Sequence, residues 1–121
     1  MLVTYGRIFA DAYKAYEKLK KDGLKVKVIK INVIVPIPQE CFEHISAAKH
    51  VFFFEEGVKS GGVGENFATQ LLEKGINAQF SLTAFPDCFV KQGKTDSILK
   101  QYSLDSEGMY NTVKSLELKH E

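Results

Sequence analysis

The feature that most constrains the fold is the stretch from His50 to Glu65, HVFFFEEGVKSGGVGE. It opens with an apolar run, residues 51–54, that does not alternate with polar residues. Because successive side chains on a strand point to opposite faces, such a run predicts a central strand with helices on each side of its sheet. The aromatic content of the run and the glycines that follow it favour a strand over a buried helical segment.

Beyond Gly64 the apolar pattern changes from strand to helix. Phe67, Ala68, Leu71 and Leu72 recur at helical spacing, so a helix is expected to begin directly after the glycine loop. A strand, a glycine loop and a helix N-terminus together form the part of an α/β domain where ligands or partners usually gather.

The other expected elements follow from the same reasoning about period and chain breakers. They are strands over 1–6, 25–35 and 77–84, and helices over 7–21, from Pro38, from Thr95 or Asp96 to Tyr102, and from Asp105. The first strand, helix and strand form a β-α-β unit, which implies a parallel strand pair. With no repeat or linker, residues 1–121 are expected to form a single domain. A start directly on a strand is also what a piece cut from a longer chain would show.

Charge and cysteine content narrow the classes of function. The 16 basic and 15 acidic residues leave a formal charge of +1, which argues against a nucleic-acid surface. The sequence has no signal peptide and no apolar stretch long enough to span a membrane, so a cytoplasmic protein is expected. Cys41 and Cys88 have no metal-site or disulfide-framework spacing and are expected to be small apolar residues in a reducing compartment.

The glycine loop matches no nucleotide-binding motif. A dinucleotide fingerprint needs a third glycine where Phe67 stands, and a Walker loop needs Gly-Lys-Ser/Thr where Val63 follows Gly62. Backbone donors at the helix N-terminus are able to hold an anion, but Glu65 already supplies negative charge in the first turn. Gly61, Gly62 and Gly64 are therefore interpreted as structural, with tight packing of helix against strand.

Glu55 and Glu56 invite a general acid–base interpretation. Adjacent side chains on a strand face opposite ways, however, so these two carboxylates are not expected to share a substrate. A carboxylate on a covered face needs a partner, and either a backbone N–H of the loop or another subunit would serve. We interpret both glutamates as structural.

No catalytic or metal-binding constellation is evident elsewhere. His44, His50 and His120 are scattered, none with the i, i+4 partner of a helical metal pair, and there is no Gly-x-Ser-x-Gly nucleophile elbow. The sequence therefore predicts neither a self-sufficient hydrolase nor a metalloenzyme.

Three segments together carry a resemblance to a known family. Residues 51–64, VFFFEEGVKSGGVG, resemble the Glu-Glu and Gly-Gly-x-Gly segment of the C-terminal domain in the transketolase group of thiamine diphosphate enzymes. Residues 85–93, FPDCFVKQG, with Asp87 and Gln92, are similar to a run typical of 1-deoxy-D-xylulose-5-phosphate synthases. Residues 102–109, YSLDSEGM, resemble the closing segment of those enzymes, and the opening Thr4-Tyr5-Gly6 fits the start of the same domain.

The resemblance implies a three-layer α/β/α domain whose mostly parallel sheet has about five strands, one of which could be antiparallel. It implies a parent enzyme that joins pyruvate to glyceraldehyde 3-phosphate with decarboxylation, using thiamine diphosphate and magnesium. In that family the cofactor is held by upstream thiamine-binding domains and the partner subunit of a homodimer. This chain is thus expected to bind no cofactor or metal and to be inactive alone, with no catalytic residue of its own. Its candidate interdomain or structural residues are Glu55, Glu56, Gly61, Gly62, Gly64, Asp87 and Gln92.

The chain departs from that family after the second strand. The usual Arg, Lys and Asp of this corner are missing from residues 32–38, NVIVPIP, where only the first proline remains. Two alternatives therefore stay open: a free-standing binding or regulatory module that kept the fold, and the C-terminal domain of a related transketolase or of a 2-oxo acid dehydrogenase E1 β subunit.

Overall fold

A computed structural model describes residues 1–32, 36–46, 48–87 and 95–119 of the chain. The strands are β1 (Leu2–Tyr5), β2 (Val28–Ile31), β3 (His50–Val58) and β4 (Gln79–Phe85). The helices are α1 (Phe9–Lys21), α2 (Gln39–Ile45), α3 (Val63–Glu73), α4 (Thr95–Gln101) and α5 (Ser106–Lys119), with a short 3-10 turn, η1 (Gly6–Ile8), before α1. None of the described helices is long and apolar enough to cross a membrane.

The four strands form one sheet in the order β2-β1-β3-β4, and every neighbouring pair is parallel. The run 51–54 is therefore part of a central strand, as the sequence predicted. The expected count of about five strands was slightly too high for the described residues, and the sheet they form contains no antiparallel member. Strand β1 lies between β2 and β3. The chain adds β2 on one side of β1 and then adds β3 and β4 on the other side, so the order in which strands are added reverses between β1 and β3.

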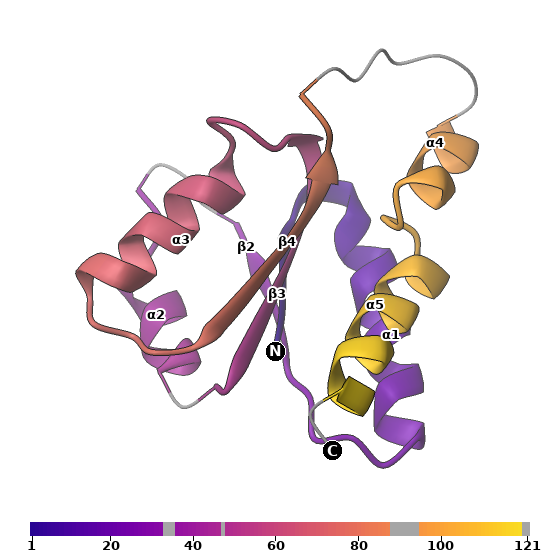
Figure 1. Ribbon diagram of the computed structural model, residues 1–121, viewed down its shortest axis with the longest axis horizontal. Coiled ribbons are helices and arrows are strands. Elements are labelled where there is room, and N and C mark those ends of the chain that lie inside the picture. Colours follow the sequence, from indigo (N-terminus) through magenta and orange to yellow (C-terminus); the bar gives the residue numbers. More distant parts are fainter. Residues whose placement is uncertain (33–35, 47, 88–94, 120–121) are drawn as a thin grey trace.

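Helices cover both faces of the sheet, which gives the expected three layers (Figure 1). Helices α1, α4 and α5 contribute to one core with the sheet residues Leu2, Phe52, Phe54 and Phe85. Helices α2 and α3 contribute to the other core with Val3, Ile31, Val51 and Phe53. The alternation of Phe52, Phe53 and Phe54 between the two cores explains why this run contains no polar residue.

Strand β2 begins at Val28, later than in the predicted range 25–35, and ends at Ile31; residues 33–35 of that prediction lie outside the described residues. It pairs with β1 only from Leu2 opposite Val28 to Tyr5 opposite Ile31, because β1 itself ends at Tyr5. The alternating pattern of the sequence does not record how long the neighbouring strand is. Asn32, which falls inside the strand expected over 25–35, is exposed and lies just past the end of β2.

The helix boundaries and faces agree closely with the sequence pattern. Asp105 caps α5 as predicted, since its Oδ1 accepts the backbone N–H of Gly108 at 2.8 Å. Phe67 and Leu71 of α3 are buried, but Leu72 from the same predicted stripe is 81% exposed. The buried stripe of α3 is therefore narrower than the sequence indicated.

Candidate functional site: the glutamate and glycine loop at the carboxyl edge

The site with the densest polar contacts lies where β3 ends and α3 begins. Strand β3 runs to Val58, a turn follows, and α3 starts at Val63 (Figure 1). This is the carboxyl edge of the sheet, beside the reversal between β1 and β3, where open α/β sheets usually bind ligands.

Glu55 lies at this edge of the sheet, and its side chain is buried. Its side chain shares a face with Phe53, toward α3, and the residue is only 2% exposed. Oε1 accepts the backbone N–H of Val63 at 2.9 Å, and Oε2 accepts that of Gly64 at 2.8 Å. The hydroxyl of Tyr5, on β1, donates to Oε1 at 3.1 Å. A buried carboxylate thus satisfies two free N–H groups of the first turn of α3 and lies at the positive end of that helix.

The glycines of this loop make room for that carboxylate. A Cβ added at Gly62 would lie 2.6 Å from Glu55 Oε1 and equally close to the carbonyl oxygen of Val58. One added at Gly64 would collide with Leu82 and stand 3.1 Å from Glu55 Oε2, and one at Gly57 would stand 3.3 Å from Oε1. Close approach, and not a left-handed backbone, is what restricts Gly62 and Gly64 to glycine, whereas at Gly57 a small shift of the Glu55 side chain would make room.

Gly61 is glycine for a different reason. Its φ is +71° and open space surrounds the position of a Cβ, so backbone conformation decides there. Its N–H donates to the carboxylate of Glu65 at 3.2 Å, which tethers the turn to the first turn of α3. Glu65 therefore contributes negative charge at this helix start, as the sequence indicated.

Glu56 points to the other side of β3 and pairs with Arg7, at the turn after β1. Its Oε2 accepts Nε–H of Arg7 at 2.7 Å, and the second guanidinium nitrogen donates to Oε1. This hydrogen bonding and the carboxylate charge raise the pKa of Arg7. Glu55 and Glu56 therefore contact different partners on opposite faces.

Asp87, just past the end of β4, contacts Ser60 in this loop. Its carboxylate accepts the backbone N–H of Ser60 at 3.0 Å and the Ser60 hydroxyl at 2.6 Å. These two hydrogen bonds hold the pKa of Asp87 below its usual value. Gln92, the remaining candidate, lies outside the described residues.

The buried carboxylate binds backbone N–H groups and a hydroxyl of its own domain. Every oxygen of Glu55 already accepts a donor from the protein, and the tyrosine beside it holds its proton firmly. Burial, followed by the charge of Glu55, raises the pKa of Tyr5 well above its ordinary value. The anion-binding capacity of the α3 N-terminus is thus taken by a side chain of the same domain.

Among residues 1–32, 36–46, 48–87 and 95–119, no set of side chains fits the magnesium and diphosphate of a thiamine cofactor. The nearest candidates are Asp22 and Asn32, but Asp22 already accepts hydrogen bonds from Tyr110 and from Lys114, the latter at 3.1 Å. Asp22 follows α1 at the amino edge of the sheet, whereas Asn32 follows β2 at the carboxyl edge, with a strand of about 13 Å between them. No group of three or more His, Cys, Asp or Glu able to hold a metal exists among the described residues.

Sequence reasoning missed three partners in this site: Tyr5, Arg7 and Ser60. They lie 50, 49 and 27 positions from the carboxylates that they contact. Pairing of β1 beside β3, and not any local pattern, brings the first two into place. The only sequence signal was that Thr4-Tyr5-Gly6 and residues 85–93 each resembled parts of the same domain.

The sheet order, the two helical layers and the glycine loop capped by Glu55 define a three-layer α/β/α domain. This chain belongs to the family "Transketolase, C-terminal domain", which it matches over residues 1–109. The match spans all elements from β1 to the start of α5.

Curated relatives of this chain include 1-deoxy-D-xylulose-5-phosphate synthases. That of Clostridium perfringens is 31% identical over 114 residues, which cover 93% of this chain and 18% of the relative. That of Dehalococcoides mccartyi is 34% identical over 124 residues, covering 96% of this chain and 19% of the relative. The chain thus spans about a fifth of the length of the relatives that it matches.

A solved structure described as "Split gene transketolase, inactive beta4 tetramer" has the same fold. It aligns with a TM-score of 0.83 at 23% identity, over 94% of this chain and 37% of the other. At this identity the similarity concerns the fold alone.

Proposed function

We propose that this chain acts as the C-terminal domain of a thiamine diphosphate enzyme of the 1-deoxy-D-xylulose-5-phosphate synthase type. The complete enzyme would condense pyruvate with glyceraldehyde 3-phosphate and release carbon dioxide. The chain's own part is to contact the upstream thiamine-binding domains and a second subunit. The observation that carries this proposal is the similarity to these synthases over more than nine-tenths of the chain.

The loop at the carboxyl edge supports a contact role. Lys59, Ser60 and Gly61 are exposed, and Val58 exposes 44% of its surface although it is apolar. Asp87 fixes Ser60, Glu65 fixes Gly61, and the next residues are held by Glu55. A loop that is already ordered loses little conformational entropy when it binds a neighbouring domain or subunit.

A domain replacement tests the proposal. In the Clostridium perfringens synthase, the C-terminal domain would be exchanged for residues 1–121 of this chain. Formation of 1-deoxy-D-xylulose 5-phosphate would then be measured with pyruvate, glyceraldehyde 3-phosphate, thiamine diphosphate and magnesium. We expect the chimera to dimerise and to recover activity that the truncated synthase lacks. A folded, dimeric chimera with no more activity than the truncated enzyme would contradict the proposal.

Two matched variants separate contact from folding. Val58→Asp places a charge on the proposed contact loop, whereas Leu72→Asp places one on the outer surface of α3, where the side chain is 81% exposed. We expect Val58→Asp to weaken dimerisation and activity of the chimera while Leu72→Asp leaves both unchanged. Equal dimerisation and activity in the two variants would contradict the proposal that the loop lies in the interface.

A second candidate function is a separate module that assembles without cofactor domains. The solved structure of similar fold is described as an inactive tetramer from a split gene, and this chain lacks the Arg, Lys and Asp expected at residues 32–38. Sedimentation of the chain alone distinguishes the two. Stable self-association together with an inactive chimera would favour the module, and a monomer that restores the chimera would favour the synthase domain.

A further inference from the structure

Strand β2 forms an open edge of the sheet. It stands at one end of the order β2-β1-β3-β4, and in the described part of the chain it pairs with β1 alone. The carbonyl oxygen of Lys27 accepts the N–H of Leu2, so the backbone of Lys27 faces β1. Because the backbone groups of successive strand residues point to alternate sides, Ile29 also faces β1, whereas the N–H and C=O groups of Val28 and Lys30 face outward. An edge of this kind is a template for a further strand.

A stripe of three aromatic rings on α1 lies beside this edge. The ring centroids of Phe9 and Tyr13 are 6.2 Å apart, and those of Tyr13 and Tyr16 are 5.7 Å apart. Tyr13 is 46% exposed, and the other two residues are half-buried. Nζ of Lys30, on β2, lies 5.4 Å from the Phe9 centroid, and both tyrosines line the same surface hollow as Val28. This aromatic stripe thus extends the outward surface of β2 on the side of α1.

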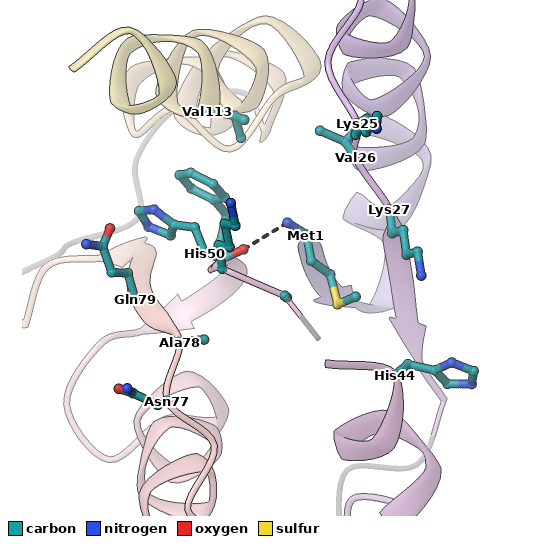
Figure 2. Close-up of a pocket in the computed structure, with 13 residues that line it drawn as sticks. Met1, Lys25, Val26, Lys27, His44, His50, Asn77, Ala78, Gln79 and Val113 are labelled. Carbon is teal, nitrogen blue, oxygen red and sulfur yellow. Dashed lines mark hydrogen bonds between the residues drawn. The ribbon is translucent and has the colours of Figure 1, made fainter. Parts of the chain in front are cut away.

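Strand β2 and the segments on each side of it in the sequence carry positive charge only. Lys27 and Lys30 are exposed, and there is no aspartate or glutamate between Asp22 and Glu40. Figure 2 shows Lys27 extending from the chain that enters β2, away from the His50 side. Among the residues that the structure describes, neither lysine forms an ion pair. Both ammonium groups therefore remain for a partner that brings carboxylates.

The lysines of β2 determine which kind of strand the edge accepts. Lysines on an edge strand usually oppose edge-to-edge pairing, and a second copy of β2 would bring both sets of lysines to one seam, where like charges repel. The same lysines attract a strand that carries carboxylates. Lys27 and Lys30 are three positions apart, so the complementary strand has two acidic residues at that spacing. The two residues between them lie opposite Val28 and Ile29 and are therefore apolar.

We propose that the β2 edge binds an extended segment of a partner protein with the pattern acidic-apolar-apolar-acidic, which adds a strand beside β2. The backbone groups of Val28 and Lys30 form hydrogen bonds with the added strand, and its two carboxylates meet Lys27 and Lys30. Residues directly opposite each other share a face of the sheet, so the apolar side chain opposite Val28 rests on the aromatic stripe. Strand β1 separates this edge from β3 and its contact loop, so this binding is independent of the proposed function.

The test is a titration of the isotope-labelled 121-residue chain with the peptide acetyl-Ser-Glu-Tyr-Val-Glu-Ser-amide, followed by amide NMR. We expect the amides of residues 27–31 and of Tyr13 to shift. Hydrogen exchange of the Val28 and Lys30 N–H groups should slow by about tenfold near saturation, because they become bonded to the peptide. Exchange of the Ile29 N–H, which already faces β1, should stay unchanged. Absence of peptide-dependent shifts at residues 27–31 would overturn the proposal.

A peptide with a modified backbone separates strand addition from simple attraction of charge. Methylation of the amide nitrogens of its tyrosine and valine keeps every side chain and both carboxylates. One of two successive N–H groups faces β2 in either register, so this change always removes a hydrogen bond of the added strand. We expect the methylated peptide to bind about tenfold more weakly. Equal binding of the two peptides would overturn the proposal.

Two double variants test the lysines. Lys27→Gln/Lys30→Gln should bind the unmodified peptide about fivefold more weakly, as expected for the loss of two exposed ion pairs. Lys14→Gln/Lys100→Gln removes the same charge from exposed positions of α1 and α4 and should bind as tightly as the unchanged chain. Equal losses in both variants would show attraction to net charge alone and would overturn the proposal. Concentration-dependent shifts at residues 28–30 without peptide would also overturn it, since they would assign the edge to a second copy.

Discussion

The carboxylate of Glu55 accepts the backbone N–H of Gly64 at 2.8 Å, so a residue of β3 caps the helix that follows it in the chain. The same carboxylate accepts Val63 N–H and the Tyr5 hydroxyl, which ties α3, β3 and β1 together at one point. In related folds this helix start is a natural place for an external anion. Here a side chain of the same domain, the Glu55 carboxylate, takes that place.

Replacing Glu55 with glutamine should destabilise the domain strongly. The amide would keep one acceptor but would turn an NH₂ group toward a backbone N–H that then has no partner in a buried site. We expect the free energy of unfolding to fall by about 2 kcal/mol or more, measured by urea denaturation. Glu56→Gln is the matched control, because its ion pair with Arg7 is exposed and should matter much less. Equal losses in the two variants would contradict the capping role of Glu55.

Alanine at Gly62 should cost more than alanine at Gly64. The added methyl at Gly62 meets the backbone carbonyl of Val58, which has little freedom to move, whereas at Gly64 it meets the flexible end of Leu82. We expect each substitution to lower the free energy of unfolding by about 1–3 kcal/mol. In a double-mutant cycle, Leu82→Ala should reduce the effect of Gly64→Ala and leave that of Gly62→Ala unchanged. Unchanged melting temperatures in both single variants would exclude close packing as the reason for these glycines.

The fold was largely predictable because its signals are local. An unalternating run, 51–54, indicated a two-sided strand, and the helix starting near Gly64 followed from a change of period. The order β2-β1-β3-β4 was not predictable, since it depends on which strands pair across long stretches of chain. The length of β2 was overestimated for the same reason, because its partner β1 sets where pairing stops.

The site was predictable only in outline. A buried glutamate at a strand end demanded a partner, and the loop N–H groups were one of two partners that the sequence left open. Nothing local indicated that Tyr5 would complete the set or that Asp87 would hold Ser60. Such contacts arise from strand pairing, so they become visible only when the sheet order is known.

Asp87 should contribute to stability above acidic pH and lose that contribution on acidification. Its pKa is lowered in the folded domain by the Ser60 hydroxyl and then by the Ser60 N–H. A carboxyl whose folded pKa is depressed stabilises the domain above its unfolded value, about 3.9, and the effect disappears as pH falls through the folded pKa. An NMR titration should therefore show a low pKa for Asp87 that moves upward in Ser60→Ala. The same pKa in both proteins would show that the hydroxyl does not control it.

Tyr5 should make the domain sensitive to alkaline pH. Burial, and then the neighbouring Glu55 carboxylate, raise its pKa when the domain is folded. A raised pKa means that the stabilising contribution is complete below the unfolded value, about 10, and is lost as pH rises above it. Urea denaturation across this range should show stability falling with pH, and Tyr5→Phe should flatten that dependence. An equally steep fall in Tyr5→Phe would assign the alkaline effect to other groups.

The chain alone should not bind thiamine diphosphate. Magnesium, which anchors the diphosphate, needs near-octahedral oxygen ligands from a carboxylate and a side-chain amide together with phosphate and water. Asp22 already accepts hydrogen bonds from Tyr110 and Lys114, and these lower its pKa, so its carboxylate is occupied by the contact between α1 and α5. Asn32 lies at the other edge of the sheet and cannot reach the same ion. Calorimetric titration with thiamine diphosphate and magnesium should give no saturable heat, whereas the chimera with upstream domains should give one. Saturable binding by the chain that disappears in Asp22→Asn would refute this prediction and would place a cofactor site where the structure shows a helix contact.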